Sequence, residues 1–108
     1  MRDKTEREQL LRDFVDEAKK REIQGLAVYG DFDPKTDTRI LSVEAQEEAL
    51  DILNYCRFLL RKYPSLREKI DGVKRLSFCI YRELRKLEAE EMRLNQSRRE
   101  AHSESYRV

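Results

Sequence analysis

The sequence predicts an all-α protein, and three observations support this prediction. Glu, Lys, Arg and Leu, which favour helices, dominate the 108 residues. Three glycines and two prolines are too few to punctuate a many-stranded sheet. Apolar residues recur at intervals of three and four, which is the period of a helix face.

The predicted helices cover about residues 5–24, 42–62 and 65–95. We expect the first helix to end at Gly25, because glycine tolerates the left-handed conformation just past a helix end. Residues 25–41 are rich in turn formers and predict a long irregular loop. We expect residues 1–96 to form a single helical domain and the polar, aperiodic residues 97–108 to form a flexible tail.

The third predicted helix carries two apolar lines. The first line is Leu66, Ile70, Val73, Leu76, Ile80, Leu84 and Leu87, and the second is Phe78, Tyr81 and Met92. One short helix and one medium helix cannot cover both lines. We therefore expect homodimerisation to complete a four-helix-bundle-like core, since small domains often finish their cores in this way.

Charge and cysteine usage exclude several classes of function. The net charge is +1 and basic residues alternate with acidic ones, so neither nucleic acid nor a membrane is an expected partner. Cys56 and Cys79 are far apart and His102 is the single histidine, which argues against a zinc site and a disulfide framework. The charged start of the chain and the lack of an apolar run of about 18 residues predict a cytoplasmic protein.

Four acidic residues form the strongest candidate site. Glu44, Glu47, Glu48 and Asp51 fall within about 100° of one another on the second predicted helix. Their mutual repulsion would be relieved by Mg²⁺ or Mn²⁺, which prefer oxygen ligands. We expect Gln46 to lie on the solvent side of this helix. The structural alternative is a solvated acidic stripe that complements the dipole of the helix N-terminus.

The segment from Glu44 to Tyr55, EAQEEALDILNY, resembles the acidic helix of MazG-like nucleotide pyrophosphohydrolases. In that all-α family an ExxE pair and a later ExxD pair bind Mg²⁺ at the triphosphate. Glu44-x-x-Glu47 matches the first pair and Glu48-x-x-Asp51 matches the second, although here they overlap on one helix. Glu68-x-x-Asp71 offers a second register for the later pair. The family builds four-helix modules, whereas three helices are evident here.

The resemblance implies hydrolysis of a nucleoside triphosphate to monophosphate and pyrophosphate by a homodimer or higher oligomer. The four acids would hold Mg²⁺ or Mn²⁺, and Glu47 would also act as general base. Lys35 and Arg39 would contact phosphate oxygens, and Tyr55 would stack on the base. An alternative from another class is a non-catalytic helical dimer that acts as an interaction or regulatory module.

Overall fold

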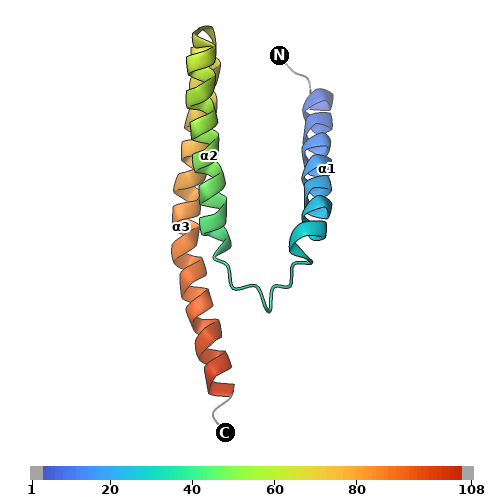
Figure 1. Cartoon of the computed structure of the whole chain (residues 1–108), viewed down its shortest axis with the longest axis vertical. Helices are drawn as coiled ribbons and strands as arrows, with labels where there is room; N and C mark the ends of the chain where they lie inside the picture. The colour runs from blue at the N-terminus through green and yellow to red at the C-terminus, as the bar shows by residue number, and fades with distance from the viewer. Residues whose placement is uncertain (1–3, 106–108) are drawn as a thin grey trace. The chain divides into compact units, whose positions relative to one another are not determined.

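The computed structural model describes residues 4–105, and all the regular structure in this range is helical. In chain order the elements are the α-helices α1 (Lys4–Tyr29) and α2 (Leu41–Lys62), the 3₁₀ turn η1 (Pro64–Leu66) and the α-helix α3 (Arg67–Ser105) (Figure 1). The all-α prediction is confirmed. The chain divides into two compact units, one ending at Asp37 and the other beginning at Thr38. The single domain over residues 1–96 stays a prediction.

Helix α1 runs past Gly25, where the sequence predicted its end, and continues to Tyr29. The stop is Gly30, whose φ of 79° lies in the left-handed region. The Gly30 N–H donates to the carbonyl of Leu26 at 3.1 Å, which satisfies one of the last free carbonyls of the helix. An interior glycine costs only about 1 kcal/mol relative to alanine, so Gly25 alone does not end the helix.

The connection between α1 and α2 is irregular and contains one tight turn. Asp33 Oδ1 accepts a hydrogen bond from the backbone N–H of Lys35 at 2.9 Å. The carbonyl of Asp33 accepts from the amides of Thr36 and Asp37 at 3.2 and 3.0 Å. Aspartate favours such turns because its short side chain bonds to the backbone two residues ahead.

Helices α2 and α3 form an antiparallel hairpin closed by η1. Helix α2 begins one residue before the predicted start at 42 and ends at the predicted residue, where Tyr63 N–H donates to Leu59 O at 2.7 Å and Pro64 follows. Helix α3 begins at Arg67 and continues about ten residues beyond the predicted end at 95. The expected flexible tail is therefore helical through Ser105. Side-chain pairs spaced three or four residues apart support this extension, such as Arg93 with Glu90 at 2.8 Å and Gln96 with Glu100 at 3.0 Å.

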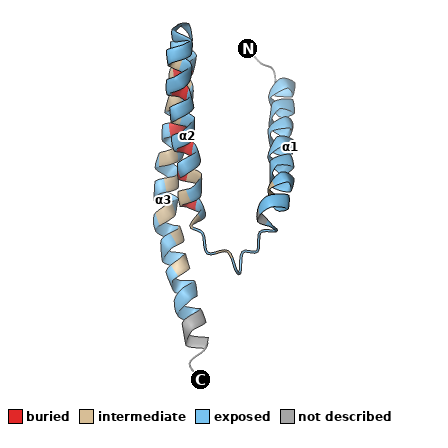
Figure 2. Ribbon diagram, viewed as in Figure 1, coloured by how far each residue is buried: buried red, intermediate tan, exposed pale blue. Residues whose placement is uncertain are grey.

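The two helices meet along a strip of buried and half-buried residues, which we call the seam (Figure 2). Its positions alternate by four and three residues on both helices, which is the spacing of a coiled coil. The seam consists of Ser42, Gln46, Ala49, Leu53, Cys56 and Leu60 on α2 and of Ile70, Lys74, Ser77, Tyr81, Leu84, Glu88, Glu91 and Asn95 on α3.

The expectation that Gln46 faces solvent is wrong, because this side chain is only 7% exposed. Its Nε2 donates to Glu88 Oε1 on α3 at 2.7 Å, which compensates for the loss of water. The solvent-facing position of Gln46 was predicted from the polarity of glutamine alone. The four-and-three spacing around it indicates the seam.

The hairpin buries few apolar residues. Among the described residues, the buried hydrophobic ones are Ala49, Cys56 and Ile70. Leu76 and Phe78, which belong to the two predicted apolar lines of the third helix, are 67% and 62% exposed. Three small or medium side chains are a thin core for two long helices, so most of the apolar surface of the hairpin has no cover within this unit.

Candidate functional site

The four predicted acids lie on the face of α2 that points away from the seam. At about 100° per residue, Glu44, Glu47, Glu48 and Asp51 are centred on the side opposite the seam. All four are exposed. We call this group the acid stripe. It is separated from α3 by the full width of α2, so any second wall of a cleft here must come from outside the hairpin.

Two aromatic side chains continue the same face toward the end of α2. Tyr55 and Phe58 are 67% and 57% exposed. Together with Asp51 and Asn54 they line a shallow depression of about 250 Å³. A carboxylate, a carboxamide and two rings thus share one exposed surface. Large aromatic residues with this much exposure are common where a surface contacts another molecule.

The acid stripe does not form a closed metal site by itself. In the part of the chain that the structure describes, no three His, Cys, Asp or Glu side chains converge to hold a cation. Mg²⁺ is commonly bound by one or two carboxylates together with waters and substrate phosphates, rather than by a cage of protein ligands. Pairs within the stripe fit that open mode of binding but not an all-protein site.

The second register lies on α3, and the predicted phosphate contacts are on residues that precede α2 in the chain. Glu68 and Asp71 are in the first two turns of α3, beside the connection that closes the hairpin, and Asp71 is half-buried. Glu44 and Glu47 are near the opposite end of α2, so the hairpin does not bring these two pairs together. Lys35 lies in the Asp33 turn of the first unit, and Arg39 precedes α2 by two residues.

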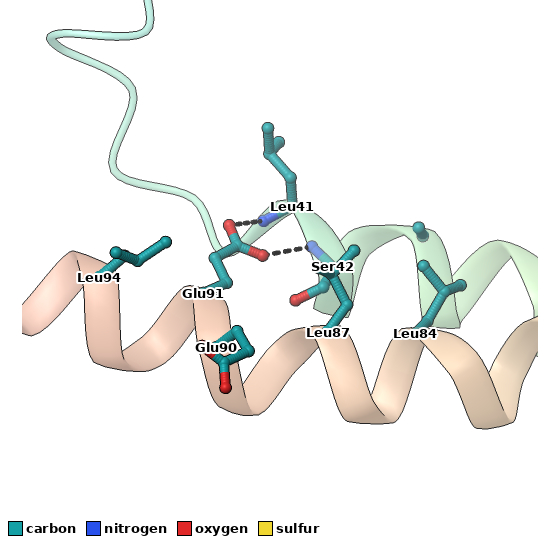
Figure 3. A pocket seen from close by; sticks show the side chains of 8 residues that line it. Leu41, Ser42, Leu84, Leu87, Glu90, Glu91 and Leu94 are labelled. Atoms are coloured by element: carbon teal, nitrogen blue, oxygen red, sulfur yellow. Dashed lines mark hydrogen bonds between the residues drawn. The ribbon is translucent and has the colours of Figure 1, made fainter.

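The seam instead contains two glutamates, Glu88 and Glu91, that are not among the site residues predicted from the sequence. Glu91 of α3 caps the N-terminus of α2: its Oε2 accepts from the Leu41 amide and its Oε1 from the Ser42 amide, each at 2.7 Å (Figure 3). Glu88 accepts from Gln46, as described above. Cross-helix partners therefore engage Glu88 and Glu91 rather than the acid stripe. The continuation of the four-and-three spacing through positions 84, 88, 91 and 95 could have identified them.

The cap shifts the ionisation of Glu91. The Ser42 side chain and the amides of Ser42 and Leu41 lower the pKa of this carboxyl below its ordinary value of 4.5, while burial acts in the opposite direction. Ser42 Oγ is buried and has no hydrogen-bond partner of good geometry among the described residues, so its hydroxyl acts on the carboxylate as a nearby dipole. The two amide hydrogen bonds hold the carboxylate at the positive end of the α2 dipole.

Next to this cap, one side of the hairpin is hollowed and apolar. The hollow has a volume of about 410 Å³ and is lined by Leu41, Ser42, Ala45, Leu84, Leu87, Glu90, Glu91 and Leu94 (Figure 3). Leu87 and Leu94 are each 54% exposed, and Leu41 is 42% exposed. Because both helices contribute to it, the hollow identifies the side on which their exposed leucines lie together.

No family model, curated protein or solved structure matches this chain. In the described residues, no helix is both long enough and apolar enough to cross a membrane. The features of the hairpin that bear on function are the acid stripe, the aromatic residues beside it and the exposed apolar surface.

Proposed function

We propose that this chain is a Mg²⁺- or Mn²⁺-dependent nucleotide pyrophosphohydrolase of the MazG-like type, active as a homodimer or higher oligomer. The observation that carries the proposal is the composition of one exposed face of α2. There the carboxylates of the acid stripe run directly into Tyr55 and Phe58. A purely solvated acidic face would have little reason to include two exposed rings, whereas a nucleotide presents both a charged triphosphate and a flat base.

The proposed role of each residue follows from its functional group. Glu48 and Asp51, with Glu44 and Glu47, would hold the cation, which would supply neutralisation of phosphate charge and activation of a water molecule. Glu47 would accept the proton of the water that attacks between the α- and β-phosphates, and the products would be nucleoside monophosphate and pyrophosphate. Lys35 and Arg39 are our candidates for phosphate contacts, and Tyr55 for stacking on the base.

A second candidate function is a non-catalytic helical dimer that acts as an interaction module. The exposure of all four carboxylates of the acid stripe favours it, because solvated carboxylates near the start of a helix are explained by the helix dipole alone. Both candidates need a second copy to complete a four-helix-bundle-like core. They differ in whether the acid stripe binds a cation.

Calorimetric titration of Mg²⁺ or Mn²⁺ into the protein, with and without a non-hydrolysable nucleoside triphosphate, separates the two candidates. The hydrolase predicts cation binding that tightens with nucleotide and is lost in the double variant Glu48→Ala, Asp51→Ala. The matched control is Glu68→Ala, Asp71→Ala, which should bind normally. Loss of binding in the control alone would indicate that Glu68 and Asp71 bind the cation. No binding in the wild type would favour the interaction module.

A further inference from the structure

The hairpin presents a continuous apolar face beside the seam. On α3 its residues follow the spacing of three, four and seven that marks one side of a helix. On α2 the residues on the same side lie about 80–100° from the centre of the seam. We define the apolar face as Leu41, Ile52 and Leu59 of α2 and Val73, Leu76, Ile80, Leu87 and Leu94 of α3.

The hollow beside the Glu91 cap shows that the two halves of this face are on one side of the hairpin. Leu41 of α2 and both Leu87 and Leu94 of α3 line it. A second hollow of about 330 Å³ follows along α3 and is lined by Ile80 and Leu87, among others. A different groove, with Leu50 and Phe78, involves residues on the other side of the seam.

The size of the apolar face identifies a protein surface as its occupant. Each of the eight side chains is 38–67% exposed. Together they offer roughly 700 Å², which is close to the roughly 800 Å² that each partner buries in an interface of standard size. This area far exceeds what a small molecule needs, and it matches one half of a symmetric dimer.

We infer that the apolar face is the surface through which two copies of this chain associate, face to face, into a four-helix assembly of two hairpins. A second copy supplies an identical apolar stripe of the same length, and such self-complementary pairing is the commonest form of oligomer. The inference rests on the proposed function only in that both require a homodimer. It does not depend on cation binding or nucleotide hydrolysis.

The same interface has a consequence for the acid stripe. Glu48 lies one helical turn before Ile52, at the border between the stripe and the apolar face. Association through the apolar face therefore brings the surface of the second copy alongside Glu48. The partner then supplies the second wall that the hairpin alone cannot give to the acid stripe.

Sedimentation velocity of the full chain over a wide concentration range tests the interface. The wild type should sediment with twice its chain mass of 13.0 kDa. The double variant Leu76→Glu, Ile80→Glu should associate at least about tenfold more weakly, because it buries charges without partners. Phe78→Glu is the matched control, since Phe78 is as exposed as Leu76 but belongs to the other side of the seam. A monomeric wild type, or equal weakening by the control, would overturn the inference.

A second measurement uses less disruptive substitutions and tests the interface even if the double variant Leu76→Glu, Ile80→Glu does not fold. With Cys79 replaced by serine, the variants Ile80→Cys and Phe78→Cys each carry one new exposed thiol, while Cys56 stays buried. The thiol at position 80 should react slowly at high protein concentration and faster on dilution, whereas the thiol at position 78 should react fast throughout. Equal reactivity of the thiols at positions 80 and 78 at every protein concentration would contradict the proposed interface. Neither measurement uses a metal. A dimer that binds no cation would therefore support the proposed interface and contradict the proposed hydrolase function.

Discussion

At the scale of single residues, Glu91 links the two helices of the hairpin. Its carboxylate accepts hydrogen bonds from two backbone N–H groups in the first turn of α2, which have no acceptor within the helix. The four-and-three spacing could place Glu91 in the seam, but it does not indicate which groups the carboxylate contacts, because Leu41 and Ser42 lie 50 and 49 positions before it. Gln46 shows the same limit, since its burial depends on Glu88 across the seam.

Replacing Glu91 by glutamine should lower the free energy of unfolding by about 1 kcal/mol, as the loss of a helix cap does. Glu90→Gln is the matched control, because Glu90 is exposed and its partner among the described residues is Arg93 of its own helix, in a surface ion pair of small value. Urea unfolding at neutral pH, followed by circular dichroism, measures both. An effect of Glu91→Gln no larger than that of the control would contradict the cap.

The contribution of Glu91 should also depend on pH. Its pKa is lower in the folded chain than the ordinary value of 4.5, so its stabilisation is present above that value. It is lost as the pH falls through the lower, folded-state pKa. The stability difference between wild type and Glu91→Gln should therefore shrink on acidification, and a difference that stays constant down to strongly acidic pH would contradict the ionised cap.

At the scale of elements, the two glycines of the first unit have opposite roles. Gly25 lies inside α1 with open space where a Cβ would be, whereas Gly30 ends the helix with a positive φ. The sequence predicts the stop at Gly25 because glycine tolerates the left-handed conformation just past a helix end. Which glycine ends a helix is decided by backbone conformation, and both candidates satisfy the sequence rule.

The same substitution should therefore have opposite effects at these two positions. Gly25→Ala should stabilise the end of α1 by about 1 kcal/mol through helix propensity. Gly30→Ala should destabilise it by about 1 kcal/mol, because alanine disfavours the left-handed conformation. Amide hydrogen exchange of the last two turns of α1 reports both changes. Equal signs for the two variants would show that Gly30 does not end the helix as described.

At the scale of the whole molecule, helical periodicity and Pro64 were enough to predict the fold class and the bounds of α2 to within one residue. It was not enough to choose between the possible faces of α3. Ile70 belongs to the predicted apolar line and is buried, but Leu76 and Ile80 of the same line are exposed. The seam follows small and polar residues such as Ser77, whose hydroxyl donates to the Ala49 carbonyl at 2.7 Å. Hydrophobicity alone does not reveal such a close-packed polar seam.

The acid stripe shows how much of a site can be predicted from a sequence. Its four carboxylates share one helix face, as their spacing requires, and Tyr55 and Phe58 continue that face. The sequence could not indicate that this face would be turned away from α3, because that depends on which residues form the seam. The acid stripe is therefore open in one copy, and the proposed function requires a second copy to cover it.

We infer that one chain does not complete its own core, and the concentration dependence of unfolding measures this. If folding and association are coupled, the urea midpoint should rise with protein concentration. A hundredfold increase should add on the order of 2.7 kcal/mol of apparent stability. Leu76→Glu, Ile80→Glu should lose that dependence, while Phe78→Glu keeps it. A wild type that unfolds cooperatively at one midpoint over the same concentration range would contradict the account.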